Sequence, residues 1–232
     1  MEQTERRASP ASGGPTIRVL VVDDEGLVRA GLRMVLTSST DITVVAEAAD
    51  GAAAVETVRT HRPDVVVMDV QMPLLDGLAA TRRIRALPDP PAVLLLTTFD
   101  LDSHVQAAVD AGASGYLLKN THHEDLLAAV RAVHRGDAAF SPPVARRVLR
   151  LAGAALPEES AVARLQGVGE ADLTVLALVG KGLSNAAIAA RLGTTEPAVK
   201  RRVRRLLAEL GCANRVQLAI AAVKARLSTQ GD

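Results

Sequence analysis

The sequence predicts two domains, an α/β domain with a doubly wound parallel sheet followed by an all-α domain. Three observations support this fold class. Runs of β-branched residues alternate with amphipathic segments through the first half, a pattern typical of a parallel sheet covered by helices. No β-like run follows Glu170. The charge also divides, because residues 16–135 hold 11 Lys/Arg against 16 Asp/Glu, whereas residues 161–226 hold 11 against 4.

The first half contains five predicted strand–helix pairs. The apolar runs predict strands at Ile17–Val22, Ile42–Ala48, Val65–Asp69, Ala92–Thr97 and Gly115–Leu118. The amphipathic segments predict helices at Leu27–Leu36, Ala52–His61, Gly77–Leu87, Asp102–Ala111 and Glu124–Arg135. Right-handed crossovers wind such pairs into an open sheet, and its ligands gather at the carboxyl ends of the strands.

The second half reads as four helices that end near glycines. They are predicted at Glu170–Val179, Asn185–Leu192, Glu196–Leu210 and Asn214–Ala225. A stretch rich in Gly, Ala and Pro separates the halves, with one helix-sized run at Val144–Leu151. We therefore expect a disordered segment at 1–15, the sheet domain at 16–136, a linker with one short helix at 137–165 and the helical domain at 166–228.

Composition excludes several classes of protein. Hydrophobic residues make up 48% of the chain and aromatic residues 1%, so the cores must be aliphatic. No apolar run approaches the roughly 18 residues of a membrane span, and we expect a cytoplasmic protein without a membrane partner. The single cysteine, Cys212, rules out an intramolecular disulfide. The basic second half favours a polyanion as its partner.

Acidic residues fall where strands of the first half are predicted to end. Asp23 and Asp24 follow the first strand, and Asp69 closes the third. The ends of parallel strands share one edge of a sheet, so these carboxylates are expected to converge on a cation such as Mg²⁺. Thr97 and Lys119 join them from the fourth and fifth strands. A carboxylate nucleophile, a divalent cation, a hydroxyl and an ammonium together suit a phosphoryl group.

These residues resemble the receiver domain of two-component response regulators, a flavodoxin-like fold. The similar motifs are Asp23-Asp24, Asp69-Val-Gln-Met-Pro-Leu-Leu-Asp-Gly77, Leu96-Thr-Thr98 and Gly115-Tyr-Leu-Leu-Lys119. The resemblance implies that Asp69 accepts phosphate from a sensor histidine kinase. It also implies that Mg²⁺ is held by Asp23, Asp24, Asp69 and the backbone carbonyl of Gln71. Thr97 and Lys119 would then contact the phosphoryl group, and Tyr116 would be the switch residue.

One departure from the receiver pattern indicates which branch of the response regulators the sequence resembles. Asn120 follows the site lysine where many receivers have proline, and the NarL/FixJ branch often lacks that proline.

The second half carries a predicted helix-turn-helix. A short helix ends at Gly193, Thr195 is a plausible N-cap for the next helix, and Pro197 suits its first turn. In this second helix we expect no acidic residue to offset the cations of the run Lys200–Arg205, which favours contact with double-stranded DNA. The expected DNA-binding residues are Thr195, Lys200, Arg201, Arg202, Arg204 and Arg205. The last 65 or so residues resemble the LuxR-type effector domain.

Two departures leave the DNA sequence preference open. Family members usually have two glutamates at the start of the domain, and here only the first has a counterpart, Asp172. Arg201-Arg202 replaces the usual Thr-His after the helix lysine.

The sequence thus predicts a phosphorylation-dependent transcriptional regulator, with Mg²⁺ as cofactor and at most slow self-dephosphorylation as enzymatic activity. A homodimer is expected on phosphorylation or on DNA. Its candidate surface is Val216, Ile220 and Val223, although the same stripe is equally suited to closing the domain's own core. Two alternatives compete. A phosphatase or phosphomutase would carry a second acid where Gln71 stands, and an RNA-binding antiterminator would be expected to carry stacking aromatics.

Overall fold

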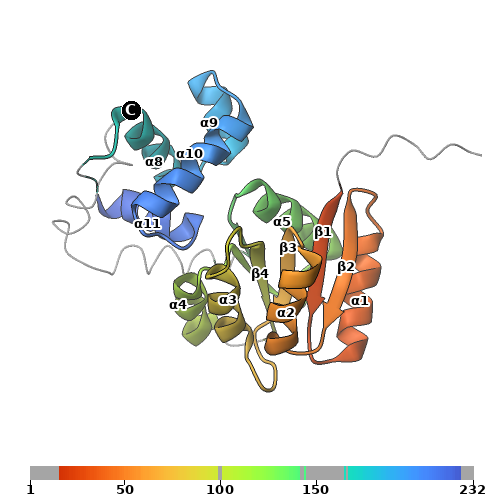
Figure 1. Cartoon of the computed structure of the whole chain (residues 1–232). Coiled ribbons are helices and arrows are strands. Elements are labelled where there is room, and N and C mark those ends of the chain that lie inside the picture. The colour runs from red at the N-terminus through yellow and green to blue at the C-terminus, as the bar shows by residue number, and fades with distance from the viewer. Residues whose placement is uncertain (1–15, 99–100, 142–143, 145–164, 166, 226–232) are drawn as a thin grey trace, which may run out of the picture.

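The computed structural model describes residues 16–98, 101–141, 144, 165 and 167–225 (Figure 1). They form a sheet domain and a helical domain that lie against each other. The predicted segment 1–15 and the helix-sized run after Val144 fall outside the described residues. The domain and linker boundaries therefore stay predictions. None of the described helices is both long enough and apolar enough to cross a membrane.

The sheet domain is built on six parallel strands in the order β2-β1-β3-β4-β5-β6. Five of them have the predicted bounds: β1 Ile17–Val22, β2 Ile42–Ala48, β3 Val65–Asp69, β4 Ala92–Thr97 and β5 Gly115–Leu118. The sixth, β6, is the two-residue strand Ala139–Phe140, which the sequence analysis did not predict. It extends the edge of the sheet at β5, where Gly115 faces Ala139.

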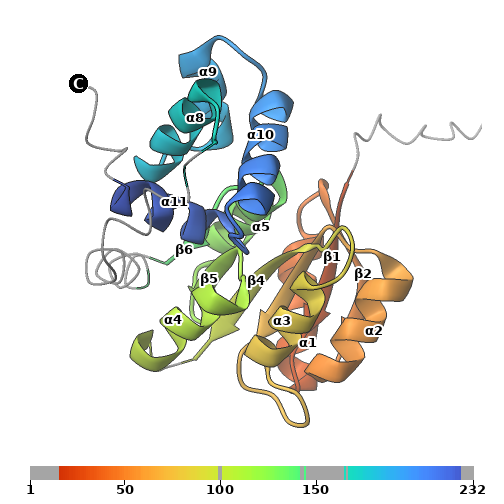
Figure 2. The same ribbon diagram turned by 60° about the vertical axis from the view of Figure 1, so that its left-hand side comes forward.

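Five helices cover the two faces of this sheet. They are α1 Gly26–Thr37, α2 Gly51–His61, α3 Gly77–Arg85, α4 Leu101–Ala111 and α5 His123–Arg135. Strand residues alternate between the faces, so that Leu20 and Val22 pack under α2, α3 and α4, whereas Val19 and Val21 pack under α1 and α5 (Figure 2). Each face therefore has its own aliphatic core, as the nearly aromatic-free composition requires.

The helical domain consists of α8 Glu170–Gly180, α9 Asn185–Leu192, α10 Glu196–Glu209 and α11 Arg215–Lys224. The first and last residues of these helices agree with the predicted helix bounds to within one residue. The Ser184 hydroxyl caps α9, and Gly193 ends it in the left-handed region at φ +61°. Thr195 is the N-cap residue of α10 as predicted, but its side chain makes no capping hydrogen bond. An aliphatic core that includes Val175, Leu176 and Ile188 joins the helices.

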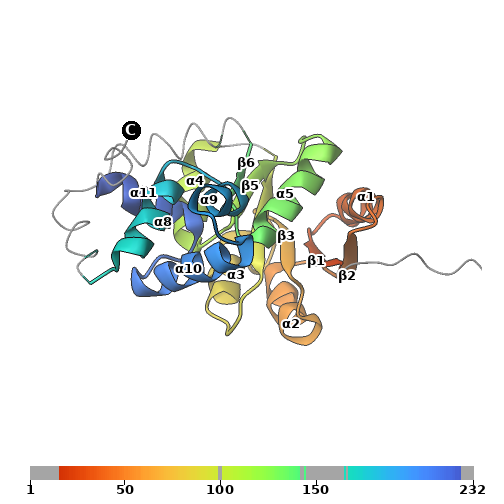
Figure 3. The same cartoon turned by 90° about the horizontal axis from the view of Figure 1, so that it is seen from above.

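The helical domain lies beyond the β5–β6 side of the sheet, and α1, β1 and β2 are on the far side (Figure 3). Helix α11 packs beside α4, and α10 runs past the end of α5. The carboxyl-terminal ends of α4 and α5 are therefore among the parts of the sheet domain in contact with the helical domain.

Candidate functional site

Three carboxylates converge where β1 and β3 end. Asp23 and Asp24 follow β1, and Asp69 is the last residue of β3, which pairs in parallel with β1. One oxygen from each carboxylate lies within 4.8 Å of the others. Asp23 and Asp69 are buried and Asp24 is exposed, so the cluster opens to solvent on one side. This set of hard oxygen donors fits a divalent cation.

Lys119 joins the cluster from the loop after β5. Its Nζ lies 2.7 Å from Oδ2 of Asp23 and 3.0 Å from Oδ2 of Asp69. Burial is the main cause that raises the pKa of Asp69; Lys119 opposes this and the Asp23 charge adds to it. Burial is the largest single influence on the pKa of Lys119 and lowers it, but the hydrogen bonds to Asp23 and Asp69 together with the charges of both carboxylates outweigh burial and raise it. The cluster is therefore a carboxylate-rich site that one ammonium only partly neutralises.

The loop after Asp69 holds its shape through a close backbone approach. A Cβ added to Gly77 would lie 2.1 Å from the backbone oxygen of Asp69, so only glycine fits. The preceding Asp76 caps α3 by accepting from the amide of Ala79 at 2.7 Å. Gln71 and Asp24 line the small hollow beside this loop. The Asp-Gly pair of the motif thus fixes the position of the Asp69 backbone.

Thr97 and Tyr116 lie on the strands between the acidic cluster and the helical domain. Thr97 ends β4, and its carbonyl accepts from the amide of Lys119 at 2.7 Å. Tyr116 on β5 is 1% exposed and packs in one apolar cluster with Val109 of α4 and Val216 of α11. The tyrosine is therefore also a packing residue, and its surroundings include both domains.

The cations of α10 face different surroundings. The Nζ of Lys200 donates to the carbonyl of His134 at 2.7 Å. Arg202 and Arg205 both form ion pairs with Asp172 of α8, and Nε of Arg205 also lies 3.7 Å from Glu209. The expectation that no acid offsets this run is therefore wrong, because the acids come from another helix and from the next turn. Arg201 and Arg204 are exposed.

Each of the two domains matches a known protein family. Residues 19–131 match the response regulator receiver domain, and residues 170–222 match the luxR family of bacterial regulatory proteins. The chain is 36% identical over 208 residues to the uncharacterized transcriptional regulatory protein YxjL of Bacillus subtilis (strain 168), covering 90% of this chain and 95% of that protein. The chain belongs to the two-component response regulators with a LuxR-type helix-turn-helix.

Other relatives agree with this assignment. The response regulator protein VraR of Staphylococcus aureus (strain NCTC 8325 / PS 47) is 34% identical over 212 residues, covering 91% of this chain and 99% of that one. A LuxR-family response regulator from Aurantimonas sp. SI85-9A1 has a TM-score of 0.56 at 36% identity, over 59% of this chain and 97% of its own. The predicted fold class, family and function as a two-component transcriptional regulator are confirmed. The sheet domain is the receiver, and the helical domain is the effector domain.

In this response regulator a polar cluster joins the receiver to the effector domain. Asp137 falls in the predicted linker but lies between α5 and the sheet strand β6, and it accepts through Oδ1 from the backbone amide of Asn185, the first residue of α9, at 3.0 Å. Asn185 in turn donates through Nδ2 to the carbonyl of Arg135 at 2.8 Å. Arg215 of α11 donates to Oδ1 of Asn185 at 2.7 Å and lies 3.8 Å from Asp137. Asn185 and Asp137 are both buried by these contacts.

A second set of contacts lies around the start of α11. Arg85, at the end of α3, donates to the carbonyl of Ala213 at 2.6 Å. The side-chain amides of Asn214 and Gln217 donate to the carbonyl of Val109 in α4 at 3.0 and 2.9 Å. These hydrogen bonds hold α11 directly against α4.

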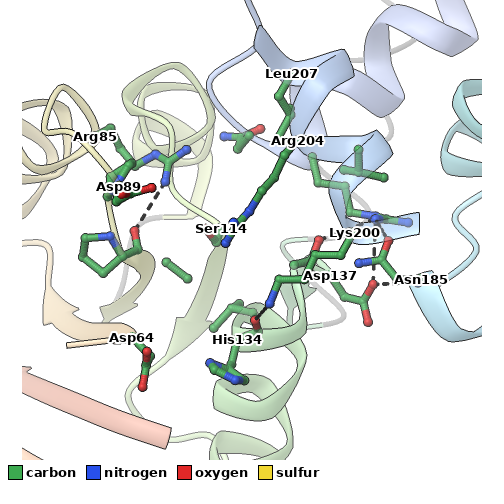
Figure 4. A pocket seen from close by; sticks show the side chains of 18 of the residues that line it. Asp64, Arg85, Asp89, Ser114, His134, Asp137, Asn185, Lys200, Arg204 and Leu207 are labelled. Carbon is green, nitrogen blue, oxygen red and sulfur yellow. Dashed lines mark hydrogen bonds and ion pairs between the residues drawn. The ribbon is translucent and has the colours of Figure 1, made fainter. Parts of the chain in front are cut away.

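A cavity of about 260 Å³ lies between these two sets of contacts (Figure 4). Lys200 and Arg204 enter it from α10, with Arg204 reaching toward Ser114 and Lys200 toward His134. Burial lowers the pKa of Lys200, and the Arg204 charge adds to the effect. Burial also lowers the pKa of His134, and Lys200 adds to it. One flank of α10 thus faces the receiver in this conformation.

The candidate dimer surface on α11 is divided between two environments. Val216 is buried in the receiver's apolar cluster, and Ile220 packs against the same cluster. Leu218 and Ala222 instead close the effector domain's own core, whereas Val223 is 39% exposed. Two of the three candidate residues are therefore covered by the receiver.

The structure brings Asp23, Asp24, Asp69 and Lys119 together as predicted, with Thr97 next to them. It divides the cations of α10 between α8, the receiver and solvent. Sequence reasoning missed the polar residues that join the domains, including Asp137 and Arg85 on the receiver side, and the acid Asp172 that pairs with α10. Asp172 was noticed only as a departure from the family pattern, and no sequence signal identified Asp137 or Arg85.

Proposed function

We propose that phosphorylation of Asp69 by a sensor histidine kinase controls DNA binding by releasing the effector domain from the receiver. The observation that carries this proposal is the position of Asp69, a buried carboxylate at a strand end, 3.0 Å from Lys119 and inside a three-carboxylate cluster. Its Oδ atom attacks phosphorus while the bond to the donor imidazole nitrogen breaks. Lys119 is placed to pair with the new phosphoryl oxygens.

The donor set supports Mg²⁺ as the cofactor. Asp23, Asp24 and Asp69 would hold it, together with the backbone carbonyl of Gln71. When bound, the cation neutralises charge that builds up on the transferring group. Lys119 contributes the remaining positive charge from its place between Asp23 and Asp69.

Coupling to the effector domain is proposed to run through Thr97 and Tyr116. A phosphoryl group at Asp69 attracts the Thr97 hydroxyl, and Tyr116 moves with it. Tyr116 packs in the same cluster as Val216, so its movement disturbs the surface on which α11 rests. A phosphoryl group shifts the equilibrium between docked and released domains only if one of these states binds it better than the other. A phosphoryl group that adjoins this apolar cluster can make that difference.

Release exposes two effector surfaces. One is the flank of α10 that carries the half-buried Lys200, beside Thr195, Arg201 and Arg204, which are already exposed but gain room for a DNA duplex when the receiver leaves. The other is the stripe Val216, Ile220 and Val223 on α11, which is proposed to pair two copies on two-fold symmetric half-sites. Phosphorylation therefore promotes dimerisation and binding to double-stranded DNA together.

Acetyl phosphate with Mg²⁺ provides the test. One phosphoryl group is expected to add per chain, and DNA affinity is expected to rise with it. Asp69→Asn should abolish both effects. Asp110→Asn, which removes an exposed carboxylate on α4, is the matched control and should preserve both. Stoichiometric phosphorylation of the Asp69→Asn protein would contradict the assignment.

A further inference from the structure

One carboxylate outside the phosphorylation site is paired with two arginines of α10, the helix proposed to bind DNA. Asp172 lies in the first turn of α8, and its side chain is 12% exposed. Its Oδ1 is 3.4 Å from Nη1 of Arg202, and its Oδ2 bonds Nη2 of Arg205. A carboxylate this buried needs partners, and the amino-terminal end of a helix favours its negative charge. The pairing is therefore a largely buried ionic contact that links α8 to α10.

The spacing of residues on α10 divides its cations into separate flanks. At 3.6 residues per turn, Val199, Val203 and Leu206 form the buried stripe. Arg202 and Arg205 fall on the side toward α8, and Lys200 and Arg204 fall on the side toward the receiver cavity. Arg201 lies opposite the buried stripe. The five cations are therefore not equivalent.

We infer that Asp172 is a positioning residue that holds Arg202 and Arg205 away from the bases, so that Lys200, Arg201 and Arg204 determine which DNA sequence is read. The inference rests on the proposed function, in which α10 binds DNA. A guanidinium bound to a carboxylate loses its freedom to reach the nearest phosphate or base edge. Asp172 also offsets one positive charge on this flank, which limits sequence-independent attraction to the DNA backbone.

Removing the Asp172 charge has a specific expected effect. Asp172→Asn keeps the size of the side chain but frees Arg202 and Arg205 to pair with phosphates. Each additional phosphate contact steepens the dependence of log affinity on log salt by about 0.9. Affinity for an unrelated duplex should therefore rise at low salt. A freed guanidinium can also reach the base edges and displace a contact made by Arg201, so the ratio of affinities for the preferred and unrelated sequences should fall by about 10-fold for one lost base contact.

The test uses the phosphorylated full-length chain. Selection from a random duplex pool with the wild-type protein supplies the preferred sequence, and a scrambled duplex supplies the reference. Affinities for both are measured over a range of KCl concentrations. Glu209→Gln is the matched control, because it also removes a negative charge near Arg205 but from a side chain that is 46% exposed. Asp172→Glu should restore most of the wild-type ratio.

The outcomes separate this inference from the proposed function. If Lys200→Ala and Arg201→Ala weaken DNA binding but Asp172→Asn leaves the ratio of affinities unchanged, or Glu209→Gln lowers it equally, only the inference about Asp172 fails. If neither alanine variant affects DNA binding, the proposed function of α10 fails.

Arg202→Gln keeps the bond between Asp172 and Arg205, so it provides a test even if Asp172→Asn does not fold. It should leave the ratio within about two-fold. A loss of discrimination at one base pair would show that Arg202 reads that base and would overturn the inference.

Discussion

Removing the Asp137 carboxylate should release the effector domain without phosphorylation. Asp137 lies on the receiver side of the interface and accepts from the amide of Asn185 at 3.0 Å. It also lies 3.8 Å from both Arg215 and Arg135. In the separated state water solvates all of these groups. Asp137→Ala therefore removes the contacts with Asn185 and Arg215, which exist only while the domains are docked.

The expected size of this effect follows from the contacts. A hydrogen bond to a charged group contributes about 1.5–3 kcal/mol, so docking should weaken by about 2 kcal/mol. For a chain docked at about 99:1, this change raises the separated fraction roughly 20-fold, and the apparent affinity for DNA rises by the same factor. The phosphorylated protein should gain much less, since its domains are already released.

Fluorescence anisotropy with a labelled duplex measures this change in both phosphorylation states. Asp125→Ala, which removes an exposed acid from α5 in the same receiver, is the control and should leave affinity unchanged. Asp137 is not part of the acidic cluster, so all three proteins should still take up one phosphoryl group per chain from acetyl phosphate. Unchanged or weaker DNA binding by the unphosphorylated Asp137→Ala protein would refute the docking account.

Three further predictions concern the receiver and its interface. Gly77→Ala should unfold the receiver or lower its free energy of unfolding by more than about 3 kcal/mol, because the new Cβ would lie 2.1 Å from the Asp69 carbonyl oxygen. Gly31→Ala has open space around it and should stabilise α1 by about 0.5–1 kcal/mol, and urea denaturation measures both changes. Burial raises the pKa of Asp69, so the native state disfavours this carboxylate and loses stability as pH rises through the window between the unfolded and native pKa values. Asp69→Asn should therefore raise the melting temperature at neutral pH without Mg²⁺, and Mg²⁺ should stabilise the wild type more than the variant; equal shifts would contradict the metal assignment. While the domains are docked, burial and the Lys200 charge lower the pKa of His134; the Arg135 charge adds to this and the Asp64 charge opposes it. Docking therefore has its full strength above the ordinary histidine pKa of about 6.5 and weakens as the pH falls through that value. DNA binding by the unphosphorylated chain should increase more from pH 7.5 to 5.5 in the wild type than in His134→Gln, and equal increases would exclude His134 as the cause.

The receiver fold was predictable because a local sequence pattern identifies each of its first five strands. Val65–Asp69, for example, is a β-branched run that ends in an acid, and its bounds agree with the structure. The acidic site followed from the same reasoning, since parallel strands such as β1 and β3 end at one edge. Strand β6 was missed because two residues give no alternation, and it exists only through pairing with β5.

The contacts between elements could not be predicted in the same way. Asp137 and Asn185 are 48 residues apart, and Asp172 and Arg205 are 33 apart. Neither pair has a periodic pattern, because each pair forms only after two finished elements pack together. Charge counts correctly identified a basic effector domain, but they could not show which arginines would be paired with Asp172. The direction of a side chain on α10 depends on its neighbours as well as on its own sequence.

Amide hydrogen exchange at Asn185 tests the central claim most directly. This residue begins α9, so its N–H has no acceptor within the helix, and its hydrogen bond goes to Asp137 across the interface. The account predicts protection of this amide in the unphosphorylated chain. Protection should be lost on adding acetyl phosphate and Mg²⁺, and kept in Asp69→Asn under the same conditions. An Asn185 amide that stays protected while phosphorylation increases DNA affinity would contradict release of the effector domain as the mechanism.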